Sequence, residues 1–131
     1  MDIIITNRAL NSYLDLLHGG YITTEIYWKL LRPVILLVRR FPDAAKFGLG
    51  KFWSPATGRR GRIPDGYKMK WHNVRDGQVQ LRLPVAIVDR SAYLSKAYVK
   101  KNRKKELREL AKFSVHIERI RQGKSGEVAR L

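Results

Sequence analysis

The sequence predicts an α+β fold, with N-terminal helices, a small antiparallel sheet with a basic concave face, and a basic C-terminal helix. Apolar residues follow a helical period in residues 7–38 and again in 104–122. Between them, over residues 67–100, apolar and polar residues alternate as they do in half-buried strands. The 131 residues suit one domain, which we place at 1–123, followed by a flexible tail at 124–131.

The first predicted helix is short and amphipathic. Thr6 or Asn7 can cap its start, and Gly19-Gly20 ends it. The spacing of its apolar residues gathers them on one face: Leu10, Tyr13, Leu14 and Leu17. We therefore expect this face to pack against the rest of the protein.

A second helix is predicted after Thr23 or Thr24, either of which can cap it. Pro33 lacks a backbone N–H and disfavours helical geometry at Arg32, so we expect a kink or a break there. The apolar run Val34–Val38 is compatible with a buried helix and with a short strand, because its periodicity does not distinguish the two.

Residues 41–66 are expected to form a long basic loop. Three prolines and five glycines lie in this stretch, and both residue types interrupt regular elements. The segment Arg59-Arg60-Gly61-Arg62 is expected at its exposed tip. Trp53, in the same loop, is a candidate for stacking on nucleic-acid bases, whereas Trp28 and Trp71 are expected in the core.

Two strands, 67–74 and 78–83, are predicted to form a hairpin. The three-residue connection between them keeps both apolar sets on one face, pairs Val74 with Gln78 and places Lys70 opposite Arg82. Because like charges opposed on a sheet destabilise it, we expect an anionic ligand beside this pair. With a further strand over 92–100, the polar face consists of Lys68, Lys70, His72, Gln78, Gln80, Arg82, Lys96, Tyr98 and Lys100.

The formal net charge is +16, and it is unevenly distributed. Residues 1–50 hold six Lys/Arg and four Asp/Glu, so 21 basic and seven acidic residues remain for 51–131. The resulting net charge of +14 over residues 51–131 is typical of a protein region that binds phosphates. A solubility effect without a ligand is the alternative interpretation.

Several classes of protein are disfavoured by composition. The chain has no cysteine, which excludes disulfides and thiolate metal sites. The apolar runs are far shorter than the roughly 20 residues of a membrane-spanning helix, and the N-terminus lacks the basic region of a signal peptide. We expect a cytoplasmic protein with no metal and no cofactor.

The final helix is expected over Lys104–Gln122. Its apolar stripe consists of Leu107, Leu110, Phe113, Ile117 and Ile120, and Gly123 follows it. Three segments then carry a resemblance: Gly77-Gln-Val-Gln-Leu-Arg82, Ala97-Tyr-Val-Lys-Lys-Asn-Arg-Lys-Lys105 and Glu106-Leu-Arg-Glu-Leu-Ala-Lys112. On these segments the chain from Lys70 to about Glu118 resembles the RelE/ParE toxin superfamily, most closely its HigB-like branch.

This resemblance implies the toxin of a toxin–antitoxin system. Such a toxin is a small endoribonuclease that typically cuts mRNA in the ribosomal A site. It is inhibited by an antitoxin protein, here expected to be acidic or of the helix-turn-helix type. The same superfamily also contains toxins that act on another target, such as DNA gyrase.

Cleaving RNA without a metal requires a base for the 2′-OH, charge neutralisation at the phosphate and an acid for the 5′-oxygen. Arg82 suits a phosphate clamp, because a guanidinium binds two oxygens and stays charged. Lys70, beside Arg82, is expected to have a lowered pKa and to act as base or electrostatic stabiliser. His72 and Tyr98 are the remaining candidates for proton transfer, although a solvated His72 and a Tyr98 that covers the sheet edge are the simpler interpretations.

Ten further basic residues are candidates for nucleic-acid binding: Lys68, Lys96, Lys100, Lys101, Arg103, Lys104, Lys105, Arg59, Arg60 and Arg62. They would contact the phosphate backbone of RNA. A non-catalytic protein that binds nucleic acid or the ribosome would use the same cationic surface. The sequence is compatible with both functions.

Overall fold

A seven-stranded, mostly antiparallel sheet forms the centre of the fold in this computed structural model, which describes all 131 residues. The strands are β1 (Asp2–Thr6), β2 (Trp53–Gly58), β3 (Gly61–Val74), β4 (Val79–Val88), β5 (Ser91–Leu94), β6 (Tyr98–Val99) and β7 (Glu127–Arg130). Their order is β2-β3-β4-β5-β1-β7, and β6 pairs with the first part of β4. The predicted α+β class is confirmed.

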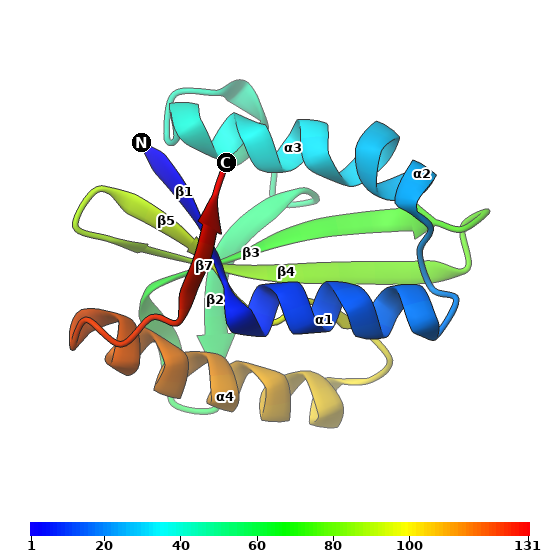
Figure 1. Cartoon of the computed structure of the whole chain (residues 1–131). Helices are drawn as coiled ribbons and strands as arrows, with labels where there is room; N and C mark the ends of the chain where they lie inside the picture. The colour runs from blue at the N-terminus through cyan, green and yellow to red at the C-terminus, as the bar shows by residue number, and fades with distance from the viewer.

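Helices cover both faces of this sheet, as Figure 1 shows with α3 on one side and α4 on the other. They are α1 (Asn7–His18), α2 (Thr24–Ile26), α3 (Arg32–Leu36) and α4 (Arg103–Arg121). A π-helical turn, Tyr27–Leu31, joins α2 to α3, and 3₁₀ turns lie at Leu37–Arg40 and Ala45–Gly48. None of these helices is both long and apolar enough to cross a membrane.

The start of each long helix follows from its cap. The hydroxyl of Thr6 accepts a hydrogen bond from the N–H of Ala9, and the side chain of Asn102 accepts one from Lys105. Pro33 lies in the first turn of α3, where its missing N–H costs little, and the helical path continues through Arg32 by way of the π-helical turn. The run Val34–Val38 is therefore helical.

Two apolar cores lie on the two faces of the sheet because successive side chains of a strand point to opposite sides. Leu81, Leu83 and Val85 of β4 belong to the larger core, which includes buried residues of α1 and α3. Ala86, on the same strand, packs in the smaller core against Leu110 and other residues of α4. The α4 face is thus apolar at one end of the sheet and polar at the other.

Both chain ends form strands that the sequence analysis did not predict. β1 pairs in parallel with β5 and antiparallel with β7, so the tail expected to be flexible at 124–131 is part of the sheet. Buried His116 fastens this tail: its Nε2–H donates to the carbonyl of Ser125 (3.1 Å), and its Nδ1 accepts from the hydroxyl of Ser95 (2.6 Å).

The expectation of a long loop over 41–66 is wrong for its second half, where β2 and the start of β3 form a hairpin. Pro55 fits there because β2 is the edge strand, on which a missing N–H breaks no sheet hydrogen bond. Trp53 is buried and stacks on Tyr67 at 5.1 Å, so it is a core residue and no candidate for base stacking. Trp71 is buried as expected, but Trp28 is 59% exposed.

The register of the β3–β4 hairpin is confirmed at Lys70, which lies opposite Arg82. A bulge between Trp71 and Val74 shifts the pairing by one residue towards the turn, so Val74 pairs with Val79 and not with Gln78. The third expected strand is divided into β5 and β6, which pair with different parts of β4.

β3 packs closely against α4 at Gly66, and substitution of this glycine tests the packing. A Cβ at Gly66 would lie 2.9 Å from the ring of Phe113 and 3.1 Å from Ile63. We expect Gly66→Ala to lower the free energy of unfolding by about 1–3 kcal/mol, because overpacking forces neighbours to shift. Gly48→Ala is the control, since a Cβ there meets nothing within 4 Å. Urea denaturation measures both, and equal stability of the two variants would contradict the prediction.

Candidate functional site: a buried cationic cluster beside Glu106

Three neighbouring strands bring ionisable side chains into one row on the α4 face of the sheet. Lys70 of β3 lies opposite Arg82 of β4, and Arg82 lies opposite Tyr98 of β6. Lys68 lies two residues along β3, on the same face as Lys70. Glu106, in the first turn of α4, completes the group. We call these five residues the cationic cluster.

Glu106 is the only carboxylate in the cluster and is 3% exposed. Its Oε2 accepts a hydrogen bond from the hydroxyl of Tyr98 (2.7 Å), and its Oε1 lies 3.5 Å from Lys68 Nζ and 3.3 Å from an Arg103 nitrogen. Burial by itself would raise the pKa of Glu106. The hydrogen bond from Tyr98 and the charges of Lys68 and other cations outweigh burial and keep this pKa below its usual value.

Arg82 is buried, although the alternation of its strand predicted a place on the polar face of the sheet. It is 3% exposed, because the start of α4 and β6 cover this part of the sheet. Its guanidinium donates to the carbonyl oxygens of Leu81 (3.1 Å) and Trp71 (3.5 Å) and to Gln80 Oε1 (3.2 Å), which are all uncharged. Three hydrogen bonds thus hold the guanidinium of Arg82 in place. Of the residues that accept them, only Gln80 is exposed.

Lys70 and His72 hold the chain segment that leads into β2. Lys70 Nζ donates to the carbonyl of Gly50 (2.8 Å), and His72 Nε2 donates to the carbonyl of Lys51 (2.6 Å). Both residues are half-buried. The pKa of Lys70 is lowered, as expected, although burial is the largest cause and the charges of Lys68 and Arg82 add to it. Lys70 therefore loses its proton more readily than an exposed lysine.

Tyr98 is a poor candidate for a base. Its side chain is buried and donates to Glu106, and burial followed by this hydrogen bond raises the pKa of the phenol. It therefore stays protonated. Burial also lowers the pKa of Lys68, and its contact with Glu106 opposes this shift.

The candidates for nucleic-acid binding lie around the cluster. Four of them, Lys100, Lys101, Lys104 and Lys105, are exposed in the segment that enters α4. Arg103 Nη2 donates to the carbonyl of Thr57 (3.4 Å), which places the start of α4 beside the β2–β3 hairpin. That hairpin carries exposed Arg59, Arg60 and Arg62, the last over the ring of Tyr67. Lys96, farther along, pairs with Glu109 at 3.1 Å.

The role of Glu106 was not recognised from the sequence, although a signal was present. Glu106 is spaced at four and seven residues from Leu110 and Phe113, so it occupies the apolar stripe of α4. An acid in a stripe that faces a row of basic strand residues indicates a buried counter-charge. Leu107, which the analysis placed in that stripe, is only half-buried.

Replacing Glu106 tests how strongly the cluster depends on one carboxylate. Glu106→Gln is expected to lower the free energy of unfolding by about 3 kcal/mol at pH 7, because it leaves Lys68 and Arg82 without a buried counter-charge. Because the pKa of Glu106 is depressed in the folded state, its carboxylate stabilises the wild type at pH values above the usual carboxyl pKa. This contribution is lost as the pH falls through the folded-state pKa. The difference in stability between the two proteins should therefore narrow as the pH falls below the usual carboxyl range.

Urea denaturation at several pH values measures this convergence. Glu118→Gln is the control, because Glu118 forms an exposed ion pair with Arg121 at the other end of α4 and such pairs contribute about 0–1 kcal/mol. A stability difference between wild type and Glu106→Gln that stays constant from pH 7 to about pH 3 would contradict the assignment.

The composition of the cluster limits the chemistry that it can perform. It combines three cations, a phenol and one carboxylate, and nowhere in the chain do three or more His, Cys, Asp or Glu residues gather as they would to hold a metal ion. Such a set can bind and polarise an anion such as a phosphodiester.

No known family model matches this chain, and no curated protein is significantly similar to it in sequence.

Proposed function

We propose that this protein is the toxin component of a toxin–antitoxin system, a metal-independent endoribonuclease similar to the HigB-like branch of the RelE/ParE superfamily. The observation that supports this proposal most is the row Lys70–Arg82–Tyr98 across three strands, with Lys68 beside it and one carboxylate among them. The excess of positive charge in this row suits an anionic substrate. The order of elements in the resembling region, a hairpin followed by β6 and α4, agrees with the proposal.

In the proposed reaction the 2′-oxygen of a nucleotide attacks the adjacent phosphorus. The 2′-hydroxyl proton passes to a base, the bond from phosphorus to the 5′-oxygen breaks, and that oxygen takes up a proton. The products are a 2′,3′-cyclic phosphate and a 5′-hydroxyl, so neither an oxidant nor a metal is needed. The enzyme has to place one base, one acid and positive charge around the phosphate.

Lys70 is the residue that we assign to the phosphate. It is half-buried, so its amine reaches solvent, and its lowered pKa suits proton transfer as well as charge stabilisation. Lys68 and Arg82 lie behind it and supply positive potential from a region of low dielectric. Tyr98 and Glu106 hold these cations in place, which makes them positioning residues in this proposal.

The RNA strand would follow the exposed basic residues that enter α4. Lys100, Lys101, Lys104 and Lys105 lie close together in the chain there, and the β2–β3 hairpin with Arg59 and its neighbours lies next to them. The proposed substrate is mRNA, bound on the ribosome in the cytoplasm. An acidic or helix-turn-helix antitoxin is the proposed inhibitor, because the same cations would bind its carboxylates.

One observation favours a second candidate function, binding of nucleic acid or the ribosome without cleavage. Arg82 and Tyr98 are buried and fully engaged with internal partners, as residues that only stabilise a fold would be. In that case the exposed lysines bind phosphates, and the cationic cluster has a structural role. Product analysis separates the two functions.

The nuclease proposal predicts that Lys70→Gln loses activity while keeping its fold. The glutamine amide retains a hydrogen-bond donor towards Gly50 but loses the positive charge. We expect cleavage of mRNA in a translation reaction to fall about a hundredfold to a thousandfold, as for the loss of one charge-stabilising group in a transition state. Lys51→Gln, an exposed lysine close by, is the control and should cut as the wild type does.

Primer extension maps the cuts, and thermal unfolding checks that each variant is folded. Cuts within translated codons that carry a 5′-hydroxyl support the nuclease. Wild-type protein that binds mRNA and leaves it intact would assign the second function. A folded Lys70→Gln protein that cuts at the wild-type rate would remove the cationic cluster from the mechanism.

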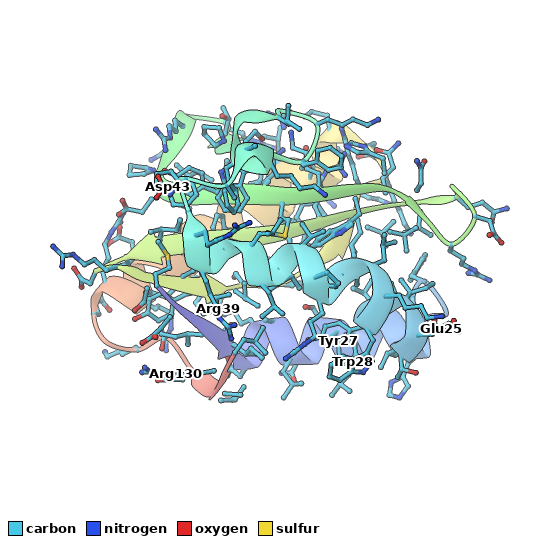
Figure 2. The ribbon with its side chains drawn as sticks, turned by 90° about the horizontal axis from the view of Figure 1, so that it is seen from above. Glu25, Tyr27, Trp28, Arg39, Asp43 and Arg130 are labelled. Atoms are coloured by element: carbon cyan, nitrogen blue, oxygen red, sulfur yellow. The ribbon has the colours of Figure 1, made fainter.

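The path of the RNA predicts a local effect on salt dependence. The double variant Lys104→Gln/Lys105→Gln should reduce the slope of log K against log salt by about 1.4, because each lost phosphate contact on a single strand changes it by about 0.7. Arg39→Gln/Arg40→Gln is the matched control: it also removes two exposed charges, at the end of the helix that covers the opposite face of the sheet (Figure 2). Equal slopes for the two variants, measured by fluorescence anisotropy, would contradict a local path.

A further inference from the structure

A polar pocket of about 330 Å³ opens between the start of α1 and the middle of α4. Figure 1 shows these two helices side by side, and Arg8 Nη1 donates across the gap to the carbonyl of Lys112 (3.5 Å). Three segments that are far apart in the chain line the pocket: Arg8 of α1, Ser95 and Lys96 after β5, and Glu109, Lys112 and Phe113 of α4. We call it the Arg8 pocket.

The Arg8 pocket has an excess of two positive charges. Its cations are Arg8, Lys96 and Lys112, and Glu109 is its one carboxylate. Glu109 lies 3.1 Å from Lys96 Nζ and 3.7 Å from Lys112 Nζ. Because this carboxylate pairs with the two lysines, the charge of Arg8 is left without a counter-charge.

Arg8 differs from the other arginines that are withdrawn from solvent. Three arginines are buried or half-buried, namely Arg8, Arg32 and Arg82. The guanidinium of Arg32 lies over the Trp28 ring, and that of Arg82 donates three hydrogen bonds. Arg8 makes a single long hydrogen bond, to the carbonyl of Lys112. Most of the five N–H donors of its guanidinium are therefore available to a ligand.

We propose that the Arg8 pocket binds a phosphate group. Arg8 binds two phosphate oxygens at once, because the fork of N–H donors in a guanidinium matches the spacing of these oxygens. Lys96 and Lys112 add ammonium charges from two other segments of the chain. The phosphate supplies the counter-charge that Arg8 lacks.

The source of the phosphate that we favour is an RNA strand, and this part of the inference rests on the proposed function. Lys112 also lines a second pocket of about 330 Å³, whose walls include Tyr98 and Glu106 of the cationic cluster. Lys112 follows Glu106 by six residues on α4, which corresponds to about 9 Å along the helix axis. The two pockets therefore form one groove along α4, from the cationic cluster to Arg8.

A 2′-O-methyl RNA dodecamer tests the inference on the full-length protein, because it lacks the 2′-hydroxyl that cleavage requires. We expect Arg8→Gln to weaken its binding about tenfold, since charge-assisted hydrogen bonds are lost. Arg40→Gln is the matched control, which removes one exposed arginine charge at the end of the helix on the opposite face of the sheet. It should bind this RNA as the wild type does. Fluorescence anisotropy measures the three affinities.

Glu109→Gln should have the opposite effect. It removes the one negative charge of the Arg8 pocket and frees two lysines, so we expect the RNA to bind about threefold more tightly. A residue that only stabilises the fold would not strengthen binding when it is replaced. If Arg8→Gln does not fold, Lys112→Gln carries the test, because Lys112 is exposed and its loss should also weaken binding.

Inorganic phosphate and AMP distinguish an RNA strand from a small free phosphate. The backbone ¹H–¹⁵N signals of Ser95 and Lys96 should shift when the RNA dodecamer binds, whereas free phosphate and AMP should shift them only at millimolar concentrations. Shifts at micromolar AMP, together with an unchanged RNA affinity of Arg8→Gln, would assign the pocket to the phosphate of a free nucleotide.

The inference would be overturned if Arg8→Gln bound RNA as the wild type does and if neither RNA, inorganic phosphate nor AMP shifted the signals of Ser95 and Lys96. Failure of the proposed function is observed separately. A wild-type protein that leaves mRNA intact contradicts the nuclease, but its binding of the uncleavable RNA still reports on the Arg8 pocket.

Discussion

The buried carboxylate of Glu106 is the interaction on which the polar end of the protein depends. Lys68, Lys70 and Arg82 share one face of two adjacent strands, and their mutual repulsion opposes the pairing of β3 with β4. Glu106 offsets this repulsion from the first turn of α4 and also fixes Tyr98 on β6. The docking of the start of α4 on the sheet and the charge balance of the cluster therefore depend on the same side chain, that of Glu106.

β3 contributes to both faces of the sheet because its side chains alternate between them. Lys70 belongs to the cationic cluster, and its neighbour Trp71 is buried in the larger apolar core on the opposite face. The two faces are also linked through a backbone group, since Arg82 donates to the carbonyl of Trp71 at 3.5 Å. A single peptide unit thus separates a region of strong positive potential from one that contains no charge.

Local patterns in the sequence predicted a large part of this fold, and contacts between distant segments account for what was missed. The cap at Thr6, the alternation in β3 and β4 and the pairing of Lys70 with Arg82 all follow from neighbouring residues. β1 and β7 are short, and each pairs only with segments that are distant in the sequence: β1 with β5 and β7, and β7 with β1. Four of the five residues of the cluster were identified, but Glu106 and the burial of Arg82 and Tyr98 were not, because both depend on the position of α4.

The pairing of β7 with β1 has a consequence for the synthesis of the protein. β1 precedes the other strands of the sheet in the chain and is therefore synthesised before them, and it lies inside the sheet between β5 and β7. Its β7 partner, Glu127–Arg130, is synthesised on the order of ten seconds later at ordinary rates of translation. Until β7 has been made, one edge of the Ile-rich strand β1 stays unpaired, so the sheet is completed only after its last strand has left the ribosome.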